Sequence, residues 1–508
     1  MPKRTVARTD LTVPAGFALL AVLIHLPVLS RYGYHHDELY FLACGRHLAL
    51  GYVDHAPLVP WIARLMDTLF PQSLFALRLP AVLAVAVAVF LTGLVARRLG
   101  GGRFAQSVAC LALIVAPAYL RVGNMLHLPP FELLLWTLAS YLVLRIVQED
   151  EPRLWPLVGL VAGVGLLNKH SMLFYGFGLV VALLLTPQRK HFRSPWLYAG
   201  AAIALSLLAL NLAWQIDNGW PTVEFLRSLN AHTMGRIPVW LFALGQVLYL
   251  NPFSAPIWIA GLVFFFSKRG APFRVLGWIY VVVFLLLVVV KSKIYYLAPA
   301  YPPLLAAGGV LIEQLAERWN ARWLRPATLG VLIAGGALLA PIGLPLLSID
   351  ATERYVNALT FGAFGNVYEL TGDLHGQFGW PERVAAVAQV YASLPSEERP
   401  RTAIYGPWYG IAGAIDYFGA AHGLPKAISG HMTYHLWGPP PGPVDTVIAA
   451  GVSREGLDAL KAIFAEVEIA AEVELENVNP WERRFLIAVC RKPRVDIQTF
   501  WPKTRNWS

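Results

Sequence analysis

The chain has 508 residues, of which 56% are hydrophobic and 14% charged, whereas an ordinary soluble domain has about 25% charged residues. This composition excludes a single water-soluble globular domain and predicts a polytopic membrane protein. The formal net charge of +10 is not arranged as basic residues interleaved with stacking aromatics, so we expect no nucleic-acid partner.

Apolar runs long enough to cross a bilayer recur through the first two thirds of the chain. Crossing takes about 17 to 25 residues of helix, and lipid leaves helices and closed barrels as the only spanning structures. The runs are continuous rather than alternating, which predicts helices. We expect about eleven, over residues 12–29, 75–96, 104–120, 131–147, 154–168, 172–186, 196–215, 252–267, 275–290, 297–312 and 327–347.

Basic residues cluster in alternate connections between these runs. The clusters lie at 3–8, 97–103, 189–193, 268–274 and 318–325. Because cytoplasmic turns retain Lys and Arg, we place the amino terminus in the cytoplasm. Residues 30–74 and 216–250 are then external loops, and we expect the functional site on their side of the membrane.

The chain changes character near residue 348. Charge rises, turns rich in Gly and Pro appear, and the pattern predicts helices over 381–394 and 454–466 with strands over 402–405, 444–449 and 485–489. About 150 residues can bury a core of their own. We therefore expect a transmembrane domain over 1–348 and a small extracytoplasmic α/β domain over 349–508. Cys44, Cys110 and Cys490 are too scattered for a disulfide framework, so we expect free thiols.

An acidic pair follows the first apolar run. Asp37 and Glu38 come directly after His35 and His36, at a membrane boundary where an unpaired carboxylate is costly. A carboxylate can accept the proton of an attacking hydroxyl, which is the task of the general base in an inverting glycosyl transfer. The structural alternative is a helix cap, since acids are favoured at the N-cap and in the first turn. The two interpretations have equal support from the residues alone.

Asp54 and His55 stand in a turn before an amphipathic segment, 58–69. They could hold a substrate, or a metal together with Asp37, or they could simply start the next helix. Both alternatives stay open on the sequence alone.

Two lysines are candidates for binding an anion. Lys169, beside His170, interrupts an apolar region, and Lys293 precedes Tyr295 and Tyr296 at the end of another apolar run. A buried lysine needs an anionic partner, and phosphate is a natural one. The alternative for Lys293 is a lysine that reaches the membrane interface beside an aromatic belt.

Two further segments carry an open choice. Residues 220–227 predict a helix lying in the outer interface, with surface packing as the alternative. Residues 429–440 contain His431 in a loop whose Trp and Tyr offer flat faces to sugar rings, with a buried loop as the alternative.

Together these segments resemble the GT-C membrane glycosyltransferases, in the branch of protein mannosyltransferase-like enzymes, aminoarabinose transferases and rhizobial galacturonosyltransferases. The resemblance covers most of the chain and is carried by residues 36–40 with 51–58, 165–172, 211–215 with 219–222, 293–302, and 429–431 with 436–440. The order and spacing of these motifs are more specific than any one of them.

The resemblance implies a hexosyl- or pentosyltransferase of a bacterial plasma membrane. Its donor would be a polyprenyl-phosphate-linked sugar, and its acceptor a lipid, glycan or protein of the cell envelope. The family pattern implies that Asp37 is the base or orients the acceptor, with Glu38 beside it. The residues implied to bind the substrate and its phosphate are His36, Asp54, His55, Lys169, His170, Lys293, Tyr295, Tyr296 and His431.

The sequence departs from the family pattern in residues 126–132. Many relatives have Asp or Asn in that turn, whereas here only Glu132 supplies an acid. Metal dependence varies among the relatives, so a divalent metal stays open and its ligands are not assigned.

Two other classes of function stay open as alternatives. A transporter or lipid flippase would also place charges inside a helical bundle, but such proteins usually contain internal repeats, and no second half of this chain mirrors the first. A noncatalytic glycolipid-binding component of a surface-polymer machine is the third class.

Overall fold

The computed structural model describes residues 11–232, 238–363 and 368–507. The basic residues at 3–8, used for the orientation prediction, and residues 233–237 of the predicted loop 216–250 lie outside this set. The chain divides into two compact units. The first comprises residues 1–29, 78–213 and 233–346, and the second comprises 30–77, 214–232 and 347–508. Residues 30–74 are therefore grouped with the carboxyl-terminal region.

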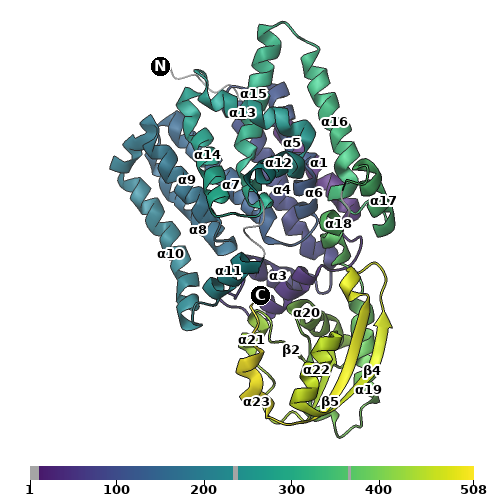
Figure 1. Cartoon of the computed structure of the whole chain (residues 1–508). Coiled ribbons are helices and arrows are strands. Elements are labelled where there is room, and N and C mark those ends of the chain that lie inside the picture. The colour runs from purple at the N-terminus through teal and green to yellow at the C-terminus, as the bar shows by residue number, and fades with distance from the viewer. Residues whose placement is uncertain (1–10, 233–237, 364–367, 508) are drawn as a thin grey trace. The chain divides into compact units, whose positions relative to one another are not determined.

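The first unit is helical (Figure 1). Its α-helices are α1 (Thr12–His25), α4 (Leu74–Arg98, whose first turn is grouped with the second unit), α5 (Arg103–Ile114), α6 (Pro117–Gly123), α7 (Leu128–Glu149), α8 (Trp155–Asn168), α9 (Met172–Leu184), α10 (Pro195–Asp217, whose last turn is grouped with the second unit), α12 (Val239–Leu250), α13 (Ala255–Phe266), α14 (Arg274–Val289), α15 (Pro302–Arg318) and α16 (Leu324–Gly343). Each helix from α4 to α16 in this list lies in or overlaps one of the spans predicted from the sequence, except α12, which falls in the predicted loop 216–250.

Helices of this unit approach one another through glycine. A Cβ added at Gly261 of α13 would stand 1.9 Å from the carbonyl oxygen of Leu304, and one added at Gly308 of α15 would stand 1.8 Å from that of Ile257. The two backbones therefore touch, as is usual where small residues line helix contacts in membranes.

Five of the described helices are long and apolar enough to cross a membrane, or up to nine spans if each bent helix pair counts as one. The predicted count of about eleven stays a prediction. The run 104–120 is broken by 66° between α5 and α6, because Pro117 lacks the amide hydrogen that a continuing helix needs. Residues 239–250, predicted as part of a loop, form the apolar helix α12, which is bent by 96° from the segment that follows.

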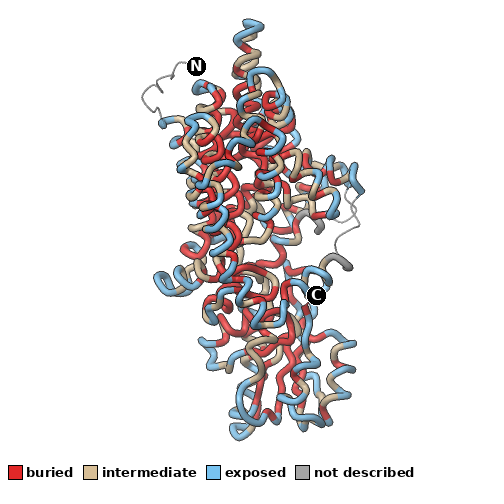
Figure 2. The backbone as a smooth tube through the Cα atoms, turned by 90° about the vertical axis from the view of Figure 1, so that its left-hand side faces the viewer, coloured by how far each residue is buried: buried red, intermediate tan, exposed pale blue. Residues whose placement is uncertain are grey.

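The second unit contains a five-stranded sheet in the order β2-β1-β3-β5-β4. The strands are β1 (Thr402–Tyr405), β2 (Ala427–Ile428), β3 (Thr446–Ala450), β4 (Phe464–Glu474) and β5 (Arg484–Pro493). Strand β1 pairs in parallel with β2 and β3, whereas β5 pairs antiparallel with β3 and β4. Figure 2 colours the backbone by burial. Residues are buried along β3 and most of β5.

Helices accompany this sheet in the same unit. They are α2 (His36–Arg46), α3 (Leu58–Leu69), α11 (Pro221–His232), α17 (Ile349–Leu359), α18 (Tyr368–His375), α19 (Trp380–Ser393), α20 (Tyr409–Phe418), α21 (Thr433–Trp437), α22 (Arg454–Ile463) and α23 (Ile497–Phe500), followed by the 3-10 helix η10 (Trp501–Thr504). The predicted helix 454–466 ends three residues early, because β4 begins at Phe464. Helix α2 packs along α20. Because Asp37 and Glu38 are in the first turn of α2, this packing brings them next to the carboxyl-terminal region of the chain.

Candidate active site

The acidic pair lies in the first turn of α2, in the second unit. The N-cap is His35, whose Nδ1 accepts a hydrogen bond from the Asp37 amide over 3.2 Å. Glu38 Oε2 in turn accepts the His35 amide hydrogen over 2.8 Å. This reciprocal pair is a capping box. The helix-cap interpretation therefore applies to Glu38, whose side chain is fully buried. Asp37 keeps a partly exposed carboxylate.

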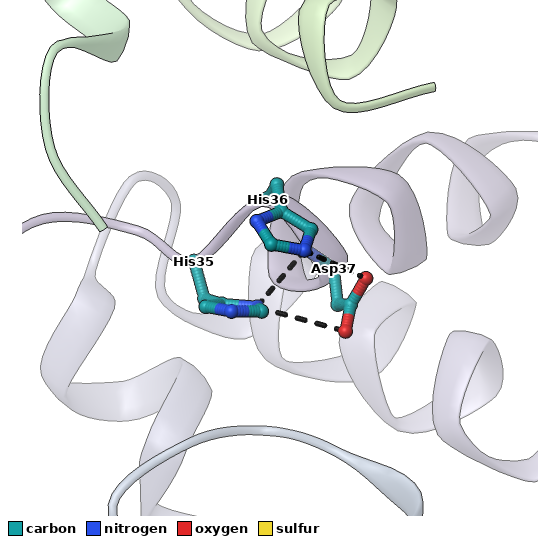
Figure 3. A group of neighbouring side chains, drawn as sticks. All are labelled: His35, His36 and Asp37. Carbon is teal, nitrogen blue, oxygen red and sulfur yellow. Dashed lines mark hydrogen bonds and ion pairs between the residues drawn. The ribbon is translucent and has the colours of Figure 1, made fainter. Parts of the chain in front are cut away.

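Asp37 lies beside both histidines (Figure 3). Its carboxylate oxygens stand 3.6 Å from His35 Nδ1 and 3.6 Å from His36 Nε2. The Tyr409 hydroxyl donates a hydrogen bond to Asp37 Oδ1 over 2.7 Å. The Asp37 side chain is 21% exposed, so its carboxylate is oriented by α20 and still accessible to a small hydroxyl group.

Aromatic rings connect Asp37 to Asp54 and His431. The Tyr409 ring stacks on Tyr40 at 4.5 Å and on His431 at 5.2 Å. The Tyr40 hydroxyl donates a hydrogen bond to Asp54 Oδ1 over 2.9 Å. Burial raises the pKa of Tyr40 and of Tyr409 well above the ordinary value, and the charges of Asp54 and Asp37 raise them further. Both phenols therefore stay protonated and act as donors to the carboxylates.

His55 lies next to Asp54 but is engaged locally. Its Nε2 is 3.9 Å from Asp54 Oδ1, and its Nδ1 is 3.0 Å from the carbonyl oxygen of Ala56. The side chain is almost completely buried. It supports the turn that presents Asp54, which has 18% of its side chain exposed.

The same region could hold a divalent metal. His35, His36 and Asp37 each offer one ligand atom, and these atoms lie within 4.8 Å of one another. Burial lowers the pKa of His35 to about 4, so its ring is neutral at ordinary pH, as a metal ligand must be. The ring nitrogens that face the Asp37 carboxylate are His35 Nδ1 and His36 Nε2, whereas the buried nitrogens that have no hydrogen-bond partner among the described residues, His35 Nε2 and His36 Nδ1, lie toward Gly376. Two imidazoles and one carboxylate fit Zn²⁺ or a similar ion.

The predicted lysines lie in the first unit. Lys169 Nζ is 2.9 Å from Glu132 Oε2, and Ser171 donates its hydroxyl to the other oxygen of that carboxylate. The same ammonium stands 4.2 Å from the centre of the Tyr296 ring and 5.4 Å from that of Tyr295. Lys169 is therefore already paired with a buried carboxylate and two tyrosine rings.

Lys293 belongs to the same neighbourhood. Its pKa is lowered, chiefly by burial and then by the positive charge of Lys169. No carboxylate lies within ion-pair distance of Lys293 among the residues that the structure describes. His170, by contrast, has its Nε2 2.9 Å from Asn211 Oδ1. Lys293 is thus the cation of this group that still needs an anion.

The structure therefore brings the predicted residues together in two groups, one in each unit. Asp37, His36, Asp54, His55 and His431 form the acid–aromatic cluster of the second unit, together with Tyr40 and Tyr409. In the first unit, Lys169 lies against Glu132, Tyr295 and Tyr296, Lys293 is close enough for the charge of Lys169 to lower its pKa, and His170 contacts Asn211 instead. Tyr409 was missed as a site residue, although the aromatic run at 408–409 was visible in the sequence.

The chain is similar in sequence to known sugar transferases. A profile of the dolichyl-phosphate-mannose-protein mannosyltransferase family matches residues 54–214. An undecaprenyl phosphate-alpha-4-amino-4-deoxy-L-arabinose arabinosyl transferase of Edwardsiella ictaluri is 25% identical over 370 residues, which are 65% of this chain and 65% of that protein. A lipopolysaccharide core galacturonosyltransferase of Rhizobium johnstonii is 24% identical over 218 residues, which are 42% of this chain and 43% of that protein.

The fold has a close counterpart among solved structures. ArnT from Cupriavidus metallidurans bound to undecaprenyl phosphate superposes with a TM-score of 0.64 at 17% identity, over 94% of this chain and 98% of ArnT. The apo form of that protein gives a TM-score of 0.60. The predicted fold class, a polytopic helical protein with a GT-C-type fold and a carboxyl-terminal α/β region, is confirmed. The chain is a multi-pass membrane protein that resembles the GT-C glycosyltransferases.

Proposed function

We propose that this protein is a membrane glycosyltransferase that moves a sugar from a polyprenyl-phosphate donor to an acceptor in the cell envelope, with inversion. The observation that carries the proposal is the partly exposed Asp37 carboxylate, held by Tyr409. The names of the two curated relatives, both sugar transferases, support it. The chain spans 65% and 43% of those relatives.

Asp37 is the proposed general base. An acceptor hydroxyl within hydrogen-bond reach, about 2.6 to 3.2 Å, gives its proton to the Asp37 carboxylate as its oxygen attacks the anomeric carbon. The bond from that carbon to the phosphate oxygen breaks on the opposite face, and the polyprenyl phosphate leaves. Such a displacement inverts the anomeric centre. Asp54, with Tyr40 as donor, is placed to bind hydroxyl groups of the substrates.

Lys293 is the proposed phosphate ligand. The departing phosphate oxygen gains negative charge in the transition state, and a fixed cation stabilises that charge. Lys169 shares its charge with Glu132, so it acts on the phosphate together with the Tyr295 and Tyr296 side chains rather than as a free ammonium. The roles proposed for Asp37 and Asp54 rest on contacts within the second unit, and those proposed for Lys169 and Lys293 rest on contacts within the first.

Several finer assignments belong to this proposal. We expect a cytoplasmic amino terminus, and an extracytoplasmic location for the active face and the carboxyl-terminal domain. The sugar is a hexose or a pentose. A divalent ion held by His35, His36 and Asp37 would supply Lewis-acid chemistry, and Asp37 would then position the acceptor hydroxyl instead of accepting its proton. Glu38 keeps its structural place in the helix cap in either case.

The test is Asp37→Asn in full-length protein reconstituted with lipid-linked sugars. The donor is identified first, by mass spectrometry of the lipid-linked sugars that accumulate in a deletion strain. Loss of a general base is expected to lower turnover by about 10² to 10⁴. The control is Asp445→Asn, which removes an exposed carboxylate paired with Arg401 in the same unit. Near-normal turnover of Asp37→Asn would remove Asp37 from the mechanism.

A further inference from the structure

Asp54 is held by a hydroxyl group from a distant part of the second unit. Thr433 Oγ1 lies 2.7 Å from the Tyr40 hydroxyl oxygen, across 393 positions of sequence, and it also accepts the Val53 amide hydrogen over 3.1 Å. Tyr40 in turn donates to Asp54 Oδ1 over 2.9 Å. One oxygen atom of Thr433 therefore contacts both the backbone just before Asp54 and the phenol that binds its carboxylate.

The direction of these hydrogen bonds follows from the number of hydrogen atoms. Tyr40 has one hydroxyl hydrogen and two neighbouring oxygens, Asp54 Oδ1 and Thr433 Oγ1. A carboxylate only accepts, whereas a threonine hydroxyl can donate or accept. The Tyr40 hydrogen therefore goes to Asp54, and the Thr433 hydrogen goes to the Tyr40 oxygen, which also accepts the Thr433 amide hydrogen over 3.2 Å. The opposite direction would leave the Tyr40 oxygen 2.9 Å from Asp54 Oδ1 with no hydrogen between them.

These groups are buried, except at the end of the chain of hydrogen bonds. Tyr40, Thr433 and Val53 are each at most 2% exposed, and a buried group that loses its partner keeps the full cost of its desolvation. Burial and the charge of Asp54 raise the pKa of Tyr40, and the hydrogen bond from Thr433 opposes this rise, as expected of a donor to the phenol oxygen. Asp54 has 18% of its side chain exposed. It is therefore the member of this chain that a substrate can reach.

The loop that carries Thr433 is held by the last residues of the protein. Asn506 donates its amide hydrogen to the Gly430 carbonyl oxygen over 2.8 Å, and its own carbonyl oxygen accepts the Met432 amide hydrogen over 2.9 Å. A Cβ at Gly430 would stand 2.0 Å from the carbonyl oxygen of Thr504, so this approach requires glycine. Met432 has a φ of 48°, which is uncommon for residues other than glycine. Backbone contacts with the end of the chain therefore set the position of Thr433.

We propose that Thr433 is a positioning residue for Asp54. This role rests on the proposed function, in which Asp54 binds hydroxyl groups of the substrates. Thr433 is itself too buried to touch a substrate, so it acts through Tyr40 and through the Val53 amide, and it fixes Asp54 from two sides. The contribution is to binding rather than to proton transfer. Loss of the hydroxyl should therefore raise a KM and leave kcat nearly unchanged.

Steady-state transfer by the full-length protein in nanodiscs tests this role. Thr433→Val removes the hydroxyl and should raise the KM for the substrate that Asp54 binds by about tenfold, the change expected for the loss of about 1.4 kcal/mol. Thr433→Ser keeps the hydroxyl and should restore most of the binding. Thr402→Val is the matched control, because Thr402 is a buried threonine of the same unit whose hydroxyl donates to the Glu398 carbonyl oxygen over 2.9 Å. An equal rise in this control, or unchanged KM values for both substrates in Thr433→Val, would overturn the proposal.

A double-mutant cycle separates positioning from a general loss of structure. Asp54→Asn alone should raise the same KM. Adding Thr433→Val to it should change that KM little, because the two residues act through one contact. Free-energy changes that add in full would contradict the proposal.

A second variant and a second measurement cover misfolding of Thr433→Val. Tyr40→Phe interrupts the chain of hydrogen bonds but keeps the bond between Thr433 and Val53, so it should raise the same KM, and unchanged KM values here would also overturn the proposal. Hydrogen exchange measured by mass spectrometry follows the Val53 amide without any substrate. Exchange in the peptide that contains Val53 should be faster in Thr433→Val than in Thr433→Ser and in the unmodified chain, and equal exchange would rule out the Thr433 contact. An unmodified chain that transfers no sugar would instead contradict the proposed function alone.

Discussion

The phenol of Tyr409 donates a hydrogen bond to Asp37 Oδ1 over 2.7 Å, across 372 positions of sequence. The same ring is stacked on Tyr40, whose hydroxyl donates to Asp54. Both partly exposed carboxylates of the acid–aromatic cluster are thus oriented by phenol hydroxyls. The orientation of Asp37 depends on α20, an element of the carboxyl-terminal region.

Removing the Tyr409 hydroxyl should lower turnover without changing the fold. Tyr409→Phe keeps the stacked ring but leaves Asp37 without this donor, so we expect kcat to fall by about tenfold, since a hydrogen bond to a charged group contributes about 1.5 kcal/mol. The KM values should change little, because the ring surface is unchanged. The measurement is steady-state transfer in nanodiscs.

The control for this prediction is Tyr417→Phe. Tyr417 lies on the same helix and shares a hydrogen bond of 2.7 Å with Tyr34, so Tyr417→Phe removes a phenol hydroxyl of the same helix whose hydrogen bond is made to Tyr34 and not to Asp37. Equal losses of kcat in the two variants would contradict a specific role for Tyr409.

Loss of Lys293 should weaken binding of the donor. Lys293→Gln removes the cation that has no carboxylate partner among the described residues, and we expect the KM for the lipid-linked donor to rise by about tenfold, as for the loss of one charge-assisted contact. Lys291→Gln is the matched control, because Lys291 is exposed two residues away. A donor KM that is unchanged in Lys293→Gln would exclude this residue as a phosphate ligand.

The pairing of Lys169 with Glu132 predicts a different result for Lys169. Lys169→Met leaves the Glu132 carboxylate, 4% exposed, buried with its ammonium partner gone, which should destabilise the protein by about 3 kcal/mol. Thermal unfolding in nanodiscs measures this loss. The double variant Lys169→Met/Glu132→Leu should recover most of the stability, and a double variant as unstable as the single one would contradict the ion-pair explanation.

The buried N-cap predicts a pH dependence of stability. Burial lowers the pKa of His35 from 6.5 to about 4, so between these values the unfolded chain binds more protons than the folded one. Stability should therefore fall as pH decreases from 6.5 to 4, by up to about 3 kcal/mol. His35→Asn keeps an N-cap acceptor without the titration. Its unfolding temperature, measured in the presence of a chelator, should depend less on pH across this window than that of the unmodified chain. Identical pH profiles would show that His35 is not responsible.

The sequence alone determined most of what local patterns encode. Apolar runs marked most of the membrane helices, and the amphipathic pattern placed α3 at 58–69. The strand at 402–405 was also predicted correctly, because a short apolar run between turn residues has few alternatives. Strand β4 was not predicted, because it is largely exposed and lacks a clear alternation of buried and exposed residues. The amphipathic pattern of α22 also continues into the first residues of β4.

Only the tertiary structure decided what the candidate residues do. Asp37 and Glu38 are equivalent in the sequence, yet the capping box uses the Glu38 carboxylate and leaves Asp37 accessible. Lys169 and Lys293 are the same residue type, yet among the described residues only Lys169 has the Glu132 carboxylate within ion-pair distance. These differences arise from hydrogen bonds and ion pairs between residues far apart in the chain, and the spacing of residues along a sequence does not specify such contacts.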